Sequence, residues 1–425
     1  MQMFIKSINA LAALVACMQP IFLLTSKHWS GGILIISSLL SLGLIGYYML
    51  LENKSIKKWS NSEKLLVLAF FAPLISTFLA AIIRQDLYWA QFDSPARFAL
   101  AAILYGTLRN TTIKPSNMLF VTIPIGIFVT FFYVTFDYGL IPSSMNRVTT
   151  HFMDPIMFGY ICLSLGLLSF FMAVTLNSGN RVLRTLNFMA GLLGVYLSML
   201  SQSRTGWFAL PIIFIIYAFR YGKETSVGFK KITLSMISVC CAVVVLLSPT
   251  IQTRFSVISD EIGNYSFEGV APDSSIGLRI TFVRIAANMV SNRILSGYGD
   301  TARVTPDFPD EAKKYSSKYV QDILFKVGFH NEIVASGIHS GILGIASVLA
   351  VFFIPCYLFY VRILSALKLN DYSPLYGLIF VIVVFVSSLT IETFGLKFAA
   401  SYYACMVAIL AVDILKYSRI EKECL

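Results

Sequence analysis

Residues 330–362 read HNEIVASGIHSGILGIASVLAVFFIPCYLFYVR and pass from a polar beginning into a long apolar run. The run at 341–362 is long enough to cross the hydrocarbon core of a bilayer, which takes about 20 residues in a helix. Two of the four histidines in the chain, His330 and His339, stand just before it. The stretch therefore predicts a transmembrane helix that carries histidines at one membrane surface.

The composition of the whole chain agrees with a membrane protein. Of its 425 residues, 57% are hydrophobic and 13% are charged, whereas a soluble domain carries roughly 25% charged residues. The net charge of +11 fits the Lys and Arg excess of cytoplasmic loops, so we do not expect a nucleic-acid partner. None of the seven cysteines falls in the long polar segment, which argues against a disulfide framework or a cysteine metal site there.

Twelve apolar runs, separated by polar or charged breaks, predict an all-α polytopic membrane protein with about 12 transmembrane helices. They cover approximately residues 7–24, 31–51, 64–83, 97–108, 117–136, 155–174, 187–201, 206–220, 232–248, 341–362, 374–390 and 397–415. The fourth, seventh and eighth runs are short for a full crossing, so one hairpin could be re-entrant instead.

The orientation follows from Lys and Arg, which are denser in the short breaks after even-numbered runs. By the positive-inside rule both termini are expected in the cytoplasm. We expect transmembrane helices 1–9 in residues 1–248, one large periplasmic helical loop at 249–340, and helices 10–12 with a cytoplasmic tail in 341–425. All four histidines then lie outside the cytoplasm.

The polar segment 249–340 shows helix and turn signals rather than low complexity. It predicts an ordered external subdomain with a helix at 251–262, a helix at 275–292 capped by Ser274 or Ser275, a turn with Gly297 and Gly299, and a helix at 309–326 led by Asp310 and Glu311. Gly328 is expected to end the last helix just before His330.

Three arginines are candidates for an anion site. Arg204 lies in the turn SQSRTGW, residues 201–207, between two apolar runs. Its guanidinium fork suits phosphate oxygens, although an interfacial arginine that reaches lipid headgroups is the alternative. Arg279 and Arg284 are five residues apart, so they point about 140° apart on a regular helix and at most one faces a shared site. Arg279 is nearer the helix N-terminus, which favours anions; otherwise it belongs to a solvated face.

His330 is the candidate for proton transfer, because histidine titrates near neutral pH. Asn331 could cap the next helix or bind a sugar hydroxyl, and His339 is expected to be a bystander. Glu332 and Asp300 are competing candidates for the base. Gly337, Gly341 and Gly344 would permit close approach of a neighbouring helix. The alternative for His330 is that it is a surface histidine without a catalytic role.

A further external loop, NRVTTHFMDP at 146–155, contributes Arg147, His151 and Asp154 as weaker candidates. The chain has no phosphate-loop motif, no H-E-x-x-H and no D-x-D pair, so we expect neither a nucleotide nor a metal cofactor. The apolar runs hold almost no ionisable residues, which argues against an ion-coupled transporter.

These motifs resemble those of the bacterial O-antigen ligases, within the wider group of O-antigen polymerases and ligases. A His-Asn pair, nine residues, Gly, two residues and Gly match the family pattern at His330, Asn331, Gly341 and Gly344. The SQSRTGW turn puts the family's arginine on Arg204, and SIGLR puts a second one on Arg279. GYGD at 297–300 is similar to a Gly-x-Gly segment of the family.

The resemblance implies a GT-C-like membrane glycosyltransferase of the bacterial inner membrane, active on its periplasmic face. It would transfer O-antigen from undecaprenyl diphosphate to lipid A–core, with inversion and without a metal or other cofactor. Arg204 and Arg279 would hold the diphosphate, and His330 would activate the acceptor hydroxyl. Asn331, Arg147 and Arg284 are further candidates for the acceptor or for support. An O-antigen polymerase is the nearest alternative, and a polysaccharide flippase is a more distant one.

Overall fold

The computed structural model describes most of the chain, and every regular element in the described residues is a helix. The described residues are 2–47, 58–111, 114–139, 147–176, 180–203, 205–221, 259–265, 267, 269–299, 310–367 and 371–423. The predicted run at 232–248, most of the predicted helix at 251–262, and Arg204 lie outside them. Over the described residues the expected all-helical architecture is confirmed.

Seven of the described helices are long and apolar enough to cross a membrane by length and composition. They are α3 (Trp29–Tyr47), α4 (Asn61–Arg84), α6 (Ser116–Tyr138), α7 (Pro155–Thr175), α8 (Arg181–Leu200), α14 (Glu332–Leu367) and α16 (Lys397–Glu423). Shorter helices occupy other predicted runs: α1 (Gln2–Cys17), α2 (Gln19–Phe22), α5 (Asp93–Leu108), α9 (Ala209–Tyr221) and α15 (Ser373–Ser388). The total of twelve crossings stays a prediction.

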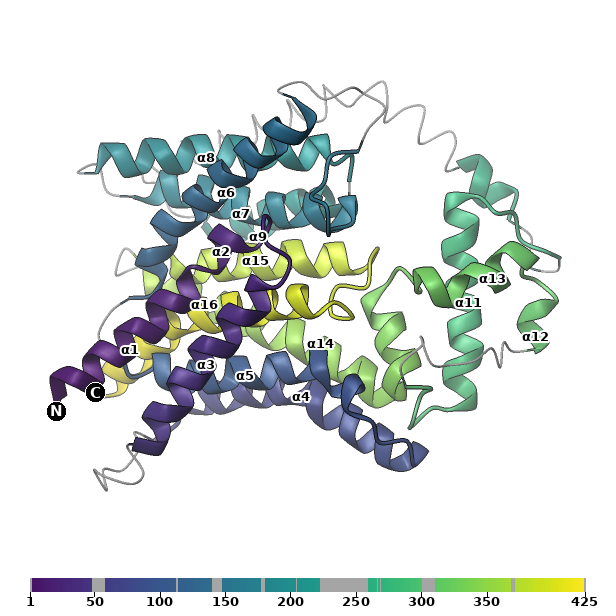
Figure 1. Ribbon diagram of the computed structural model, residues 1–425, viewed down its shortest axis with the longest axis horizontal. Coiled ribbons are helices and arrows are strands. Elements are labelled where there is room, and N and C mark those ends of the chain that lie inside the picture. The colour runs from purple at the N-terminus through teal and green to yellow at the C-terminus, as the bar shows by residue number, and fades with distance from the viewer. Residues whose placement is uncertain are drawn as a thin grey trace.

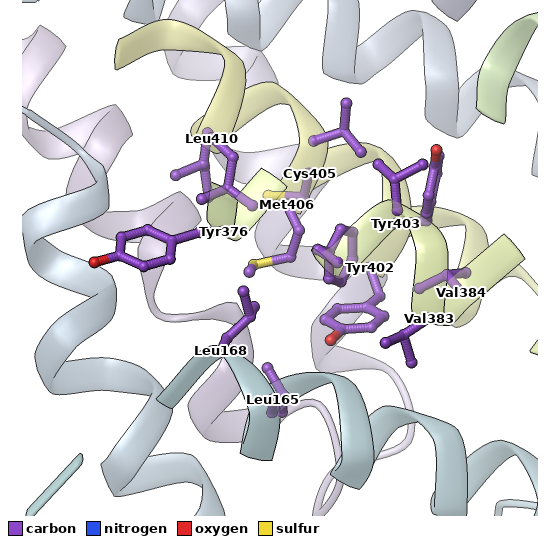
Figure 2. Close-up of a cluster of buried hydrophobic side chains, with 14 of the residues drawn as sticks. Leu165, Leu168, Tyr376, Val383, Val384, Tyr402, Tyr403, Cys405, Met406 and Leu410 are labelled. Atoms are coloured by element: carbon purple, nitrogen blue, oxygen red, sulfur yellow. The ribbon is translucent and has the colours of Figure 1, made fainter. Parts of the chain in front are cut away.

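Helices α7 and α16 form the centre of the bundle together with α15 (Figure 1). The membrane windows of α7 and α16 are 94% buried, against 33–44% for the other five candidate spans. Side chains such as Leu168 of α7, Tyr376 of α15 and Met406 of α16 meet in this core (Figure 2). A hydrogen bond of 2.8 Å between the Ser164 and Tyr402 hydroxyls joins α7 to α16.

A buried ion pair joins α4 to the end of α5. Glu63 forms a capping box with Ser60 at the start of α4, and its carboxylate also accepts a hydrogen bond of 2.8 Å from Arg109 Nε. Both side chains are almost inaccessible, and Asp413 in α16 is buried as well. Glu63 and Arg109 lie just outside the predicted runs 64–83 and 97–108, and Asp413 lies near the end of the run 397–415, so these groups do not contradict the expectation that the spans hold almost no ionisable residues.

The segment predicted as an external subdomain contains α11 (Ser275–Asn292), α12 (Asp310–Lys313) and α13 (Lys318–Val327). Figure 1 shows it at one end of the molecule, opposite the beginning of α1 and the end of α16. Its small core includes Phe282, Met289, Tyr315, Leu324 and Phe329. The helix predicted at 275–292 is confirmed, with the Ser274 hydroxyl accepting a hydrogen bond of 3.1 Å from Gly277 N–H.

The single helix predicted at 309–326 is wrong, because α12 ends at Lys313 and α13 begins anew at Lys318. Ser317 caps α13 by accepting from Val320 N–H and donates to Asp273 at 2.6 Å. Serine side chains that bond nearby backbone compete with a continuous helix, and here Ser317 starts a new one.

Helix α14 is two helices joined at a break. Ser340 and Gly341 have non-helical backbone angles, with φ +62° and ψ −149° at Gly341. The loop 293–299 fits into the break: Ile342 N–H donates to Ile294 O at 2.7 Å and Gly299 N–H donates to His339 O at 3.0 Å. The expectation that a neighbouring helix approaches Gly341 is wrong, because this loop occupies the space beside it.

Candidate active site

His330 lies in the short connection between α13 and the first part of α14. Gly328 ends α13 with φ +78°, and His330 itself has φ +50°, a left-handed conformation that is rare for a residue with a side chain. The imidazole is half-buried and lies parallel to the ring of Phe282 in α11, with 6.0 Å between the ring centroids and 10° between the planes. A helix of the external subdomain therefore orients this ring.

Arg279 stands one helical turn before Phe282, so it projects from the same side of α11. It is exposed and has no side-chain hydrogen bond or ion pair with any other described residue. Burial lowers the pKa of His330, the positive charge of Arg279 lowers it further, and the negative charge of Asp154 raises it. The charges of Arg279 and Asp154 therefore both act on His330, and the net lowering of its pKa favours the neutral imidazole.

Asp154 belongs to the membrane bundle, where it caps α7. Its carboxylate accepts a hydrogen bond of 2.7 Å from Ile156 N–H, and Pro155 occupies the first helical position. The N-terminus of α7 carries a partial positive charge that favours anions. The site thus joins the external subdomain to the beginning of the central helix α7.

Arg147 lies beside the turn at 201–207. Its Nε donates to Ser201 O at 3.1 Å, and the next residue, Val148, donates from its backbone to Leu200 O at 3.1 Å. Arg204 in the same turn is not among the described residues, so its place near His330 stays a prediction. Arg147 is exposed, so its guanidinium lies at the surface beside this turn.

Arg284 is engaged on another side of α11, away from His330. Its guanidinium donates to the Tyr265 hydroxyl at 3.2 Å and to Phe267 O at 3.1 Å, and it lies 3.9 Å from the centroid of the Tyr315 ring. These contacts link α11 to the preceding loop and to the region after α12. They favour a supporting role over contact with a substrate.

Asn331 and Glu332 are both used within the protein. The Asn331 side chain accepts from Ile333 N–H at 2.9 Å and Val334 N–H at 3.2 Å, and it donates to Leu389 O at 3.1 Å. Glu332 is 4% exposed and accepts from Phe394 N–H at 2.7 Å. Asn331 therefore caps α14, and Glu332 is poorly placed to take a proton from a sugar. Asp300, the other competing base, lies outside the described residues.

The remaining histidines lie in other surroundings. His28 is exposed before α3, and His151 is 76% exposed with its Nε2 3.4 Å from Asp137. His339 stands immediately before the break in α14, and its carbonyl accepts from Arg84 at 2.9 Å. No cluster of three or more potential metal ligands occurs in the part of the chain that the structure describes.

Two neighbours of His330 were not identified from the sequence. Phe282 lies three residues after Arg279 on α11, so helical spacing could have placed it on the same side. Glu392, which contacts the backbone beside His330, comes from a loop more than sixty residues away in the chain and leaves no local signal. Together the residues can hold an anion at Arg279 and accept a proton at His330.

Comparison with known proteins places a family domain over this region. Residues 189–349 match a family model described as O-Antigen ligase; the match includes the turn at 201–207, α11 and the His330 segment. A protein of Haemophilus influenzae, described only as an uncharacterized protein, is 25% identical over 328 residues, which cover 75% of this chain and 77% of that protein.

Proposed function

We propose that the protein transfers O-antigen polysaccharide from undecaprenyl diphosphate to the lipid A–core oligosaccharide, because residues 189–349 match a family model described as O-Antigen ligase. The family match supports, more coarsely, an integral membrane transferase of the ligase and polymerase group that handles lipid-linked polysaccharide. The identity of the donor, the identity of the acceptor and the location of the reaction at the periplasmic face of the inner membrane go beyond the family match and are parts of this proposal.

The observation that carries the proposal is an exposed arginine, with no bonded partner among the described residues, beside a half-buried histidine. A diphosphate leaving group needs positive charge as it departs, and Arg279 offers a guanidinium fork that no other described residue binds. Arg204 would add a second fork from the turn at 201–207. No carboxylate of the described residues forms an ion pair with Arg279, so its positive charge is available to bind the donor.

His330 would act on the acceptor. Its lowered pKa keeps the imidazole neutral near neutral pH, so a ring nitrogen can accept the proton of the acceptor hydroxyl. The acceptor oxygen forms the new bond to the anomeric carbon while the bond from that carbon to the diphosphate oxygen breaks on the opposite face. This displacement inverts the anomeric configuration, and the diphosphate leaves with the electron pair.

An O-antigen polymerase is the alternative, because the family match covers ligases and polymerases alike. A polymerase would use the same donor and add it to another lipid-linked repeat. Deletion of the gene separates the two: loss of a ligase leaves undecaprenyl-linked polymer and uncapped lipid A–core, whereas loss of a polymerase leaves core that carries a single repeat.

The test of the site is His330→Ala in the deletion strain, with His28→Ala as a matched control because His28 is exposed and stands before α3, outside the segments that contact His330. We expect His330→Ala to abolish capped lipopolysaccharide and to accumulate undecaprenyl-linked O-antigen, while His28→Ala caps normally. Normal capping by His330→Ala would refute the role of His330. Purified wild-type protein should join lipid-linked glycan to lipid A–core in detergent without ATP.

A further inference from the structure

The loop between α15 and α16, residues 389–396, bonds the residues on both sides of His330: the backbone of Phe329 before it and the side chains of Asn331 and Glu332 after it. On one side, Phe329 N–H donates to a carboxylate oxygen of Glu392. On the other side, Asn331 donates to Leu389 O at 3.1 Å and Phe394 N–H donates to Glu332 at 2.7 Å. Phe329, Asn331 and Glu332 are therefore all attached to one loop of the membrane bundle.

The backbone at His330 requires such attachment. Gly328 has φ +78° and His330 has φ +50°, so two of three successive residues are left-handed. A residue with a side chain stays in this conformation only where its surroundings hold it there. The conformation matters because it directs the imidazole against Phe282 and toward Arg279.

Glu392 fits closely against this turn. A Cβ added to Gly328 would lie 2.7 Å from the Glu392 carboxyl carbon, so the carboxylate occupies the space beside the glycine. Burial raises the pKa of Glu392, while the hydrogen bond from Phe329 N–H lowers it. A buried carboxylate is costly unless it is hydrogen-bonded, and a backbone donor next to His330 provides that bond.

We infer that Glu392 is a positioning residue for His330: its carboxylate holds Phe329 N–H, fixes the left-handed turn, and thereby aims the imidazole at the acceptor. Glu332 and Asn331 hold the following residues and set the direction in which α14 leaves. Glu392 itself touches no substrate in this arrangement. The inference rests on the proposed function of His330, which the wild-type and His330→Ala assays test separately.

The test compares Glu392→Ala with Glu392→Gln in the purified full-length protein. Glu392→Ala leaves Phe329 N–H without its acceptor, and we expect kcat for ligation to fall about 10- to 100-fold. The KM for the lipid-linked donor should stay within about twofold, because Arg279 lies on α11 and not on the loop. Glu392→Gln keeps an acceptor oxygen in the same place, so it should restore most of the lost kcat.

Asp371→Ala is the matched structural control. Asp371 also accepts a backbone N–H, from Ser373 at 3.0 Å, but at the opposite end of α15. We expect this variant to lower the thermal midpoint of unfolding and to keep the wild-type kcat per folded molecule. Equal losses of kcat in Glu392→Ala and Asp371→Ala would reduce Glu392 to a stabilising residue and overturn the inference.

A second measurement does not depend on ligation. Diethyl pyrocarbonate modifies accessible imidazoles, and mass spectrometry of the peptide that contains His330 gives the rate. We expect Glu392→Ala to raise this rate severalfold as the ring leaves Phe282, and Asp371→Ala to leave it unchanged. An unchanged rate in Glu392→Ala overturns the inference. If wild-type protein does not ligate but the rates differ as expected, the proposed function fails and the positioning role stands.

Discussion

Replacing Gly341 by alanine should separate the loop 293–299 from the break in α14. Gly341 has φ +62° and ψ −149°, a region essentially restricted to glycine. A Cβ at this position would collide with Ile294 O and lie 2.8 Å from the Ile294 carbonyl carbon, where ordinary van der Waals contact begins at 3.4 Å. Both are backbone atoms, so no side-chain rotation relieves the collision.

The size of the effect follows from two contributions. The backbone conformation costs about 1–3 kcal/mol for a residue with a Cβ. Moving Ile294 away also breaks its hydrogen bond of 2.7 Å from Ile342 N–H, which contributes about 1 kcal/mol. We therefore expect Gly341→Ala to lower the free energy of unfolding by about 2–4 kcal/mol.

Gly43→Ala is the matched control, because a Cβ at Gly43 in α3 meets nothing within 4 Å. It should leave stability unchanged or raise it by up to about 1 kcal/mol, as for alanine replacing glycine in a helix. The assay is denaturant unfolding of purified protein in detergent, followed by tryptophan fluorescence, with hydrogen exchange at Ile342 N–H as the local readout. A Gly341→Ala protein as stable as Gly43→Ala, with unchanged exchange at Ile342, would refute the reasoning.

Three further substitutions test the charges of the fold and the site. Arg279→Gln removes the positive charge that lowers the pKa of His330. The pKa of His330 should therefore rise, and the acid limb of the pH–rate profile for ligation should move to higher pH. An acid limb that stays in place would contradict the proximity of the two residues. Arg109→Ala leaves Glu63 buried without its cation and should lower the free energy of unfolding by about 3–5 kcal/mol. Lys313→Ala removes an exposed partner and should change it by less than about 1 kcal/mol; similar losses in these two variants would argue against the buried pair.

Much of the fold was predictable because its signals are local. Apolar runs of sufficient length predicted the candidate spans, and a serine before a periodic segment predicted the boundaries of α11. Helical spacing predicted that Arg279 and Arg284 point to different sides, and Arg284 is in fact enclosed by Tyr265 and Tyr315. The break between α12 and α13 was missed: Ser317 caps a new helix at Val320 N–H, and it also donates to Asp273, forty-four positions away, a contact that no local pattern indicates.

The sequence by itself determined that this chain is an apolar, helical membrane protein with a polar segment before its last apolar runs, and it singled out His330 and Arg279 as candidates. Only the tertiary structure decided how His330 is held. The left-handed turn, the stacking on Phe282 and the contact with Glu392 join segments that are distant in the chain, and hydrogen bonds between such segments exist only after the bundle has packed.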